Sequence, residues 1–144
     1  MKKILISAVV VAIGLGKALY DFKMNPVINY AGVFIVLAGV LIWITGRVSL
    51  GRFFTINLGL VSSHKLVKRG IYKYIRHPIY LGLFLIAVGV TTTLSSLSTG
   101  ALMAAMVLPL IVHDIITEER FLAKKFKKYN KYCEETKRII PWIW

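Results

Sequence analysis

The chain has 144 residues, of which 57% are hydrophobic and only 17% are charged, yet its formal net charge at pH 7 is +13. This length predicts a single domain. The apolar fraction exceeds the roughly 45–50% of soluble domains and excludes a disordered basic tail. A strong positive charge is typical of proteins that bind nucleic acid, a membrane surface or an anionic ligand, so the positions of the charges must decide among these classes.

Four long apolar runs dominate the chain, and crossing the ~30 Å hydrocarbon core of a bilayer takes about 20 apolar residues. The runs are Ile4–Tyr20, with Lys17 near its end, Val27–Thr45, Ile79–Leu97 and Ala101–Ile116, the last broken only near its end by His113 and Asp114. They predict an all-α, multi-pass membrane protein with about four transmembrane helices. A cleaved signal peptide is the alternative for the first run, but no clear A-x-A cleavage site follows it.

Short sequence signals mark the ends of these predicted helices. Asn25-Pro26 and His77-Pro78 each combine a capping position with a first-turn proline, so they predict the starts of the second and third helices. The short polar stretch Ser95–Gly100 predicts an antiparallel hairpin between the third and fourth helices. Pro109 predicts a kink in the fourth helix.

The basic residues are distributed unevenly between the two sides that four spans would create. One side would hold 17 of the 19 Lys and Arg residues, from the N-terminus, the loop Arg47–Arg76 and the tail from Arg120 onward, whereas Lys17 and Lys23 lie on the other. The positive-inside rule places the rich side, and both termini, in the cytoplasm. The net charge is therefore mainly a topology signal, and nucleic-acid binding is not expected.

The first cytoplasmic segment, His64–Gly82, contains residue types suited to ligand binding. Gly70 allows a tight turn or a close approach of a ligand to the backbone. Tyr72 and Tyr80 offer aromatic faces, and Arg76 lies with its neighbouring histidine at the predicted start of a helix, which favours anions. The alternative, a basic interfacial linker that holds phospholipid headgroups, explains the lysines of this segment but not its Gly, His and Pro residues.

The second cytoplasmic segment, Glu118–Pro141, is predicted to contain an amphipathic helix that lies on the membrane interface or covers the bundle. Its apolar stripe consists of Leu122, Phe126, Tyr129 and Cys133, at spacings of 4, 3 and 4. Projected backwards, the stripe points Glu118 toward the interior, while Glu119 lies about 100° around the helix. Carboxylates at a membrane boundary need partners, such as Arg76 or Arg120. Such a pair has a functional interpretation and a structural one, a Glu–Arg lock between helix and loop.

Other kinds of site are not indicated. The three histidines and Cys133 lack metal-ligand spacing, so no metal is predicted. No Gly-rich phosphate loop and no serine nucleophile elbow is present. The lone cysteine excludes an internal disulfide. Any catalysis would therefore depend on bringing two bound molecules together.

The two segments resemble the membrane-embedded methyltransferases of the isoprenylcysteine carboxyl methyltransferase and phospholipid methyltransferase family. The matching residues are His64-x-Leu66-Val67, Gly70-x-Tyr72, Arg76-His77-Pro78-x-Tyr80-x-Gly82 and, after a helical hairpin, Glu118-Glu119, Phe126, Tyr129, Tyr132, Arg138 and Pro141. Lys127 departs from the family, many of whose members have Gly after the Phe. The resemblance implies one membrane-embedded domain, 1–144, with two N-terminal spans in 1–46 and a catalytic core in 47–144.

The resemblance also implies S-adenosylmethionine as methyl donor and S-adenosylhomocysteine as product. Carried over by position, the cofactor-binding residues would be His64, Lys65, Leu66, Val67, Gly70, Tyr72, His77, Pro78, Tyr80 and Glu118. Arg76 would face the reacting group and Glu119 would lie near the acceptor, although the two glutamates could exchange roles. These assignments place the active site on the cytoplasmic side of a cell membrane or, in a eukaryote, of the endoplasmic reticulum.

The expected reaction is carboxyl O-methylation of a lipid-like or lipidated acceptor, such as an isoprenylcysteine group, because arginine suits a carboxylate. Membrane lipids are the other expected partners. Three alternatives stay open: an N- or S-methyltransferase acting on a phospholipid amine or a small thiol, an NADPH-dependent sterol-type reductase, and a non-enzymatic membrane protein. The oligomeric state is not predicted, although Gly32 and Gly39 would permit close helix contacts.

Overall fold

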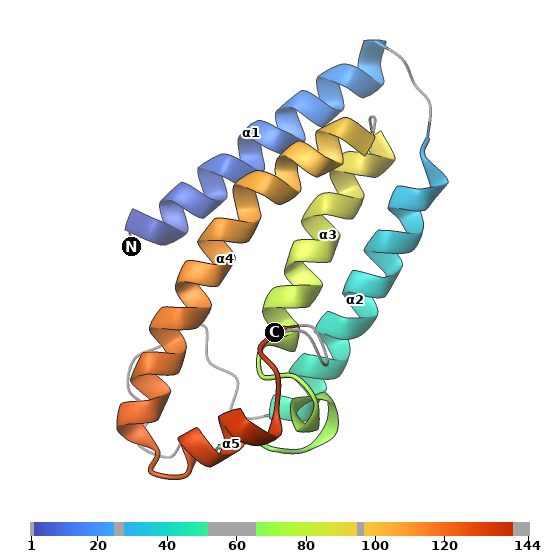
Figure 1. Ribbon diagram of the computed structural model, residues 1–144. Helices are drawn as coiled ribbons and strands as arrows, with labels where there is room; N and C mark the ends of the chain where they lie inside the picture. Colours follow the sequence, from blue (N-terminus) through green and yellow to red (C-terminus); the bar gives the residue numbers. More distant parts are fainter. Residues whose placement is uncertain (1, 25–27, 52–65, 95–96, 140–144) are drawn as a thin grey trace.

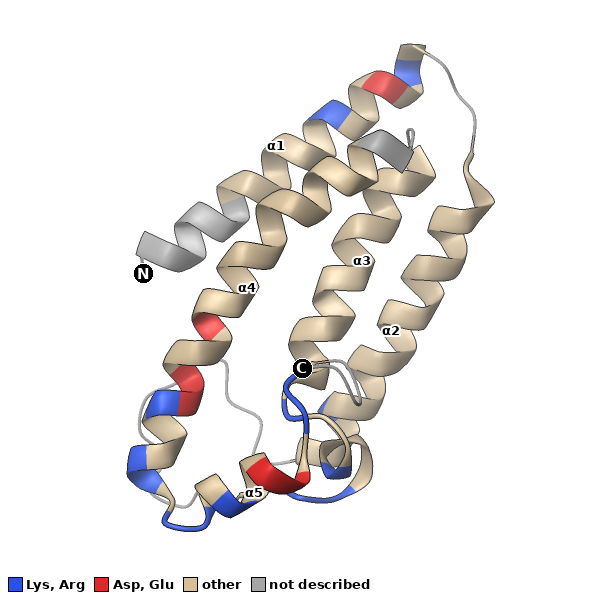
Figure 2. Cartoon of the chain, viewed as in Figure 1, with Lys and Arg blue, Asp and Glu red and all other residues tan. Residues whose placement is uncertain are grey.

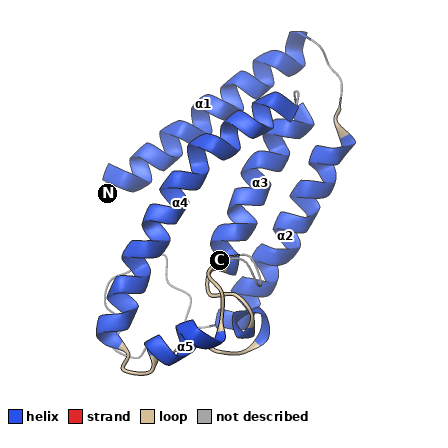
Figure 3. Ribbon diagram, in the orientation of Figure 1, coloured by secondary structure: helices blue, strands red, loops and turns tan. Residues whose placement is uncertain are grey.

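The computed structural model describes residues 2–24, 28–51, 66–94 and 97–139. Within these ranges the chain forms helices and no strand, which confirms the all-α prediction. The elements are α1 (Lys2–Met24), α2 (Tyr30–Leu50), the 3-10 helix η2 (Gly70–Lys73), α3 (Pro78–Leu94), α4 (Leu97–Lys125) and α5 (Tyr129–Glu135). Figure 3 shows that, in the described part of the chain, loops are confined to the ends of the helices.

The long helices run alternately up and down, and α3 lies between α2 and α4 (Figure 1). The most extensive packing is between α2 and α3, followed by that between α3 and α4, while α1 crosses against α3 and α4. The short helix α5 runs across the end of the bundle where α2 and α4 end and α3 begins (Figure 1). This end therefore brings together segments that are more than 40 residues apart in the sequence.

Among the residues that the structure describes, two helices are long and apolar enough to cross a membrane: α2, and the part of α4 from Thr99 to Lys125. The third apolar helix, α3, has 17 residues and falls just short by length alone. The helical character of all four predicted spans is confirmed, with α1 longer at both ends than the expected Ile4–Tyr20. The number of four membrane crossings stays a prediction.

Glycines allow α2 and α3 to approach closely. A methyl group built on Gly39 would lie 2.9 Å from the carbonyl oxygen of Gly82, and one built on Gly82 would lie 2.8 Å from the carbonyl oxygen of Gly39. Such contacts are too short for any other residue, so this seam requires glycine on both helices. The close helix contact expected from Gly32 and Gly39 is thus made within the chain, because Gly32 also faces α3.

The predicted helix ends agree with the structure only in part. Pro78 is the first residue of α3, as expected. The predicted cap Asn25-Pro26 lies outside the described residues, and α2 begins at Tyr30 with Asn29 as its cap, whose side chain accepts a hydrogen bond from the Ala31 N–H at 3.0 Å. The helix α4 begins at Leu97, four residues before the predicted start. It changes direction along its course (Figure 1), consistent with the Pro109 within it.

The prediction of one continuous C-terminal amphipathic helix is wrong. The helix α4 runs on to Lys125, the chain turns at Phe126–Lys128, and α5 begins at Tyr129. The predicted apolar stripe therefore crosses a turn, and only its part up to Leu122 lies on α4, together with Glu118. The structure buries Glu119, which is 8% exposed as a residue, more deeply than Glu118.

Candidate functional site

The sequence motifs meet at the end of the bundle formed by the start of α3, the end of α4 and α5. Of the basic residues in the described part of the chain with described side chains, all but Lys17 and Lys23 lie at this end (Figure 2). Four acidic residues lie here as well: Glu118 and Glu119 on α4, and Glu134 and Glu135 on α5. The site therefore combines carboxylates with a surplus of positive charge.

Backbone pairing aligns the segment before α3 with the segment after α5. Ile75 and Lys137 form a parallel bridge, and the Arg76 N–H donates to the Lys137 carbonyl at 2.8 Å. The next residue continues the pairing, because the His77 N–H donates to the Arg138 carbonyl at 3.0 Å. Ile75 is 3% exposed, so the pairing is supported by burial. The tail thus determines where the side chains of Arg76 and His77 lie.

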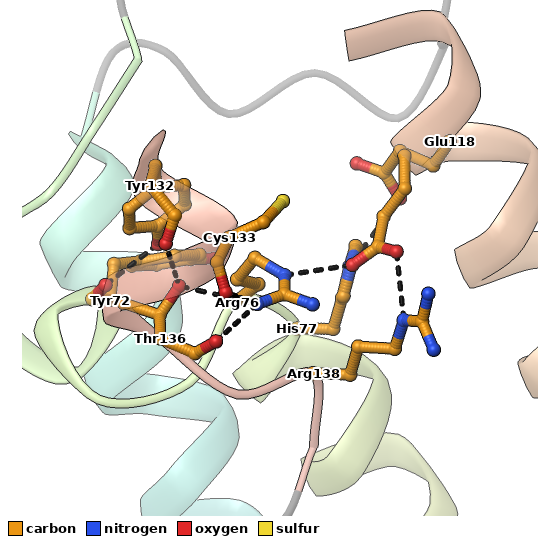
Figure 4. A network of polar contacts seen from close by, with 9 residues as sticks. Tyr72, Arg76, His77, Glu118, Tyr132, Cys133, Thr136 and Arg138 are labelled. Atoms are coloured by element: carbon orange, nitrogen blue, oxygen red, sulfur yellow. Dashed lines mark hydrogen bonds and ion pairs between the residues drawn. The ribbon is translucent and has the colours of Figure 1, made fainter. Parts of the chain in front are cut away.

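The guanidinium of Arg76 is held by several acceptors at once (Figure 4). Its Nε donates to Glu119 Oε1 at 2.8 Å, and its Nη1 donates to the Cys133 carbonyl at 3.1 Å. Nη1 also donates to the carbonyl oxygen of Thr136. The side chain is only 8% exposed. Arg76 therefore joins the start of α3, the end of α4 and the end of α5, in the manner of the structural Glu–Arg lock that the sequence left open.

Glu119 is held on both of its oxygens. Oε1 accepts from Arg76, and Oε2 accepts from Arg138 Nε, also at 2.8 Å. His77 Nε2 lies 3.4 Å from Oε1. A carboxylate buried this far from water is costly unless it is both paired and hydrogen-bonded, and here two guanidinium groups meet that requirement. The resemblance implies that Glu119 lies near the acceptor. Direct contact between Glu119 and an acceptor would require Arg76 or Arg138 to move away.

Glu118 faces a different set of residues. Its carboxylate lies beside the Tyr80 hydroxyl, and Oε2 is 3.8 Å from His77 Nδ1. Tyr72 also lies within its electrostatic reach, and burial together with the Glu118 charge raises the pKa of the Tyr72 hydroxyl. The side chain of Glu118 is 24% exposed, so it is open to an incoming molecule to a degree that Glu119 is not. Glu118, Tyr72 and Tyr80 form what we call the aromatic–acid face.

His77 lies between the two glutamates and is almost fully buried, with a side chain that is 4% exposed. Its ring centroid is 5.8 Å from that of Tyr80. Its Nε2 is a buried nitrogen with no hydrogen-bond partner of good geometry within the described ranges. Because Nε2 faces Glu119 Oε1 at 3.4 Å and Nδ1 faces Glu118 Oε2 at 3.8 Å, the ring links the two carboxylates.

Tyr132 and Thr136 connect α5 to the segment that carries Tyr72. The Tyr132 hydroxyl donates to the Tyr72 carbonyl at 2.6 Å, and the Thr136 hydroxyl donates to the Tyr132 carbonyl at 2.5 Å. Tyr132 is 3% exposed, and its burial raises the pKa of its hydroxyl, so the group stays protonated as a donor. The ammonium of Lys68 lies 5.0 Å from the Tyr132 ring centroid. These contacts attach α5 to η2.

The structure brings together most of the residues that the sequence singled out. They are Tyr72, Arg76, His77, Pro78, Tyr80, Glu118 and Glu119. Gly70 has a φ of +60°, which confirms the tight turn, and its Cα faces the Ser49 hydroxyl so closely that a side chain would not fit. Leu66 and Val67 are half-buried. His64 and Lys65 lie outside the described residues.

Two participants were not expected in these roles. Arg138 appeared only as a match to the resemblance and Thr136 not at all, yet both contact the Arg76–Glu119 pair. Helical periodicity could not find them, because both follow the end of α5. The signal that was available is the need of two carboxylates at a membrane boundary for cationic partners.

Comparisons with known proteins agree with this arrangement. A protein of Oryza sativa subsp. indica named "Probable protein-S-isoprenylcysteine O-methyltransferase" is 32% identical over 128 residues, which cover 85% of this chain and 66% of the rice protein. Protein-S-isoprenylcysteine O-methyltransferase B of Arabidopsis thaliana is 28% identical over 124 residues, 84% of this chain and 63% of the relative. Methanethiol S-methyltransferase 1 of Bradyrhizobium diazoefficiens is 29% identical over 129 residues, 82% of this chain and 44% of the relative.

The chain therefore spans just under two thirds of the length of the two plant relatives that it matches. The sequence profile of the isoprenylcysteine carboxyl methyltransferase family matches residues 27–124, a range that contains α2, η2, α3 and nearly all of α4. Both site motifs, at Arg76–Tyr80 and at Glu118–Glu119, fall within that range. This protein belongs to the isoprenylcysteine carboxyl methyltransferase family.

Proposed function

We propose that this protein is an S-adenosylmethionine-dependent methyltransferase that methylates the carboxylate of a lipidated acceptor, of the isoprenylcysteine type, at the cytoplasmic face of a membrane. Family membership supports the reaction class, and the names of the two plant relatives support the acceptor. The observation that carries the proposal is the aromatic–acid face, whose Glu118 carboxylate lies beside the Tyr80 hydroxyl and 3.8 Å from His77 Nδ1. It provides groups suited to a cationic donor next to the family motif.

The residues present fit the proposed cofactor. A carboxylate and two aromatic rings favour positive charge, and Glu118 with Tyr72 and Tyr80 supplies both. The start of α3 is a helix N-terminus, which suits the anionic part of the ligand. S-adenosylmethionine supplies a methyl group whose bond to a positively charged sulfur breaks as a bond to the acceptor oxygen forms. A carboxylate acceptor is already ionised at neutral pH, so it has no proton to lose. Leu66, Val67, Gly70 and Pro78 complete the proposed binding segment.

The proposed role of Glu118 is to bind the cationic part of the donor. Arg76 and Glu119 are proposed to act mainly by position, since their charged groups are already engaged with each other and with the tail. They keep His77 and Glu118 at fixed separation, which matters because methyl transfer requires donor and acceptor to be held in line at ~3–3.5 Å. This differs from the direct contact with the acceptor that the resemblance suggested for Arg76.

We further propose that four helices cross the membrane with both termini in the cytoplasm. Support comes from the charges, because the site end carries nearly all of the described basic side chains and the opposite end only Lys17 and Lys23. The length and composition of α2 and α4 are those of membrane spans. A lipidated acceptor would then reach the site from within the same leaflet, its isoprenoid chain staying in the bilayer.

A thiol acceptor is the second candidate, and the match to methanethiol S-methyltransferase 1 is the observation that favours it. The two reactions differ in their demand on the site, because a thiol must lose a proton and a carboxylate does not. The carboxylate is preferred because the site end has a surplus of positive charge, and because the two plant relatives, matched over 66% and 63% of their own length against 44%, are named as O-methyltransferases.

The test uses the purified, detergent-solubilised chain. Calorimetry with S-adenosylhomocysteine should show binding at micromolar concentration, and mass spectrometry should show methylation of an S-farnesylated cysteine derivative with a free carboxylate. The matched acceptor is the same compound with its carboxylate converted to an amide, which should not react. An absence of binding would overturn the cofactor assignment. Binding with transfer to methanethiol alone would replace the carboxylate by the thiol.

A further inference from the structure

The end of α4 and the turn that follows it carry a concentrated basic surface. Between Arg120 and Cys133 the sequence has no acidic residue. Six basic residues lie in this stretch and all six are exposed: Arg120, Lys124, Lys125, Lys127, Lys128 and Lys131. We refer to these six residues as the basic patch. None of them belongs to the aromatic–acid face or to the Arg76–Glu119 pair, so the proposed methyl transfer does not explain them.

The length of α4 places the basic patch at the level of lipid headgroups. A helix of 29 residues is about 43 Å long at 1.5 Å per residue, whereas the hydrocarbon core is ~30 Å thick. If the helix starts near one boundary of the core, its last two turns or so extend past the other. Arg120, Lys124 and Lys125 lie in those turns, and the chain then turns into α5, which runs across the end of the bundle (Figure 1).

Aromatic side chains within the basic patch also suit a headgroup layer. Phe121 is 40% exposed, and the Lys125 ammonium lies 5.8 Å from its ring centroid and 5.8 Å from that of Phe126. An exposed aromatic ring among lysines is unfavourable in bulk water but favourable where acyl chains meet headgroups. The patch therefore combines an apolar contact with positive charge, as an interfacial surface does.

We propose that the basic patch binds the headgroups of anionic phospholipids in the leaflet next to the site. Clusters of four to eight Lys and Arg residues directly beyond a membrane helix bind anionic lipids, with about a fivefold gain in affinity for each basic residue near the surface. The patch begins directly after the apolar part of α4, so its partner must lie at membrane level. That position favours lipid over a soluble polyanion.

The experiment is native mass spectrometry of the detergent-solubilised protein with phosphatidylglycerol or phosphatidylcholine of the same acyl chains. The wild type should bind phosphatidylglycerol at least about tenfold more tightly than phosphatidylcholine. The variant Lys124→Gln/Lys127→Gln/Lys128→Gln/Lys131→Gln should lose most of this preference. The matched pair is Lys127→Gln/Lys128→Gln against Lys17→Gln/Lys23→Gln, since both remove two positive charges but from opposite ends of the bundle.

The outcomes separate the proposal from its competitors. It is supported if the preference falls in the fourfold and the Lys127/Lys128 variants and persists in the Lys17/Lys23 variant. It is overturned if the preference is unchanged in the first two, or if all variants lose it equally. Displacement of the lipid by millimolar inorganic phosphate, or tighter binding of an RNA oligonucleotide or an acidic peptide than of phosphatidylglycerol, also overturns it. The Lys127/Lys128 variant keeps the test valid if the fourfold variant does not fold, and no readout depends on methyl transfer.

Discussion

The two ends of the helical bundle each hold a carboxylate bound to cations, but in different surroundings. At one end Asp21 lies 2.6 Å from Lys17 on the next turn of α1 and accepts from the Thr99 hydroxyl at 3.3 Å. Half of the Lys17 side chain is exposed. At the other end Glu119 lies 2.8 Å from both Arg76 and Arg138, and its side chain is only 11% exposed.

The comparison shows that distance alone does not rank these pairs. Exposed pairs are screened by water and contribute little, whereas breaking a buried pair leaves a charge without compensation. The Glu119 end also connects three segments through hydrogen bonds, while the Asp21 end connects α1 and α4 through one hydroxyl. Substitutions at the two ends should therefore differ widely in their effects on stability.

Arg76→Gln should destabilise the protein most. It leaves Glu119 with one guanidinium partner fewer and removes a donor from the carbonyls of Cys133 and Thr136. Removing one partner of a buried pair costs about 3–5 kcal/mol. Thermal denaturation in detergent should show a markedly lower midpoint, and S-adenosylhomocysteine binding should weaken in parallel. If the variant has the thermal midpoint of the wild type but no methyltransferase turnover, Arg76 contacts the acceptor directly and its proposed positioning role is wrong.

Glu118→Gln should separate ligand binding from stability. The substitution removes the negative charge that faces Tyr80 and Tyr72, and losing a charged interaction of about 1.5–3 kcal/mol weakens binding roughly tenfold to a hundredfold. The midpoint should change little, because this side chain is 24% exposed. Calorimetry with S-adenosylmethionine measures the effect, because S-adenosylhomocysteine lacks the sulfonium charge, and Glu134→Gln, at an exposed position of α5, is the control.

The opposite pattern is expected for Glu119→Gln, namely a lower midpoint with a smaller change in intrinsic affinity. If both glutamate variants lost affinity equally at unchanged stability, the division of roles between Glu118 and Glu119 would be wrong.

Tyr132→Phe should have an intermediate effect. The variant keeps the buried ring and removes only the hydroxyl that donates to the Tyr72 carbonyl at 2.6 Å. A hydrogen bond of this kind contributes about 1 kcal/mol. Because Tyr72 belongs to the aromatic–acid face, the KM for S-adenosylmethionine should rise while kcat changes little. The matched variant Tyr74→Phe, at a position 61% exposed, should change neither constant. A fall in kcat alone for Tyr132→Phe would contradict the assignment.

Much of the fold could be predicted because apolar runs, helix caps and motif spacing are local signals. Pro78 at the start of α3 and the turn at Gly70 are examples. The end of α4 could not be predicted in this way, because the stretch from Phe121 to Tyr132 contains neither Gly nor Pro. We attribute the break after Lys125 to tertiary packing, since it lets Tyr129 and Tyr132 become buried, at 2% and 3% exposed.

The break after Lys125 also brings the tail, with Arg138, back to Glu119. The pairing of Arg76 and His77 with Lys137 and Arg138 joins segments about 60 residues apart, and neither segment has a periodic pattern that would reveal it. Sequence reasoning therefore named Arg76 as one possible partner of the two glutamates but did not find the tail that holds the Arg76–Glu119 pair. It also expected Glu118 to be the inward glutamate; Glu118 does face His77 and Tyr80, but Glu119 is buried more deeply.

Asp21→Asn should have the smallest effect of these substitutions. It removes the ion pair with Lys17, but Lys17 is half exposed and can be solvated, and the asparagine oxygen can still accept from Thr99. Neither the thermal midpoint nor S-adenosylhomocysteine binding should change measurably relative to wild type. Because Asp21→Asn and Glu119→Gln each replace one carboxylate by its amide, the ratio of their midpoint shifts measures the contribution of burial directly. Equal shifts would mean that the two ends are held alike, and that the greater burial around Glu119 adds nothing to stability.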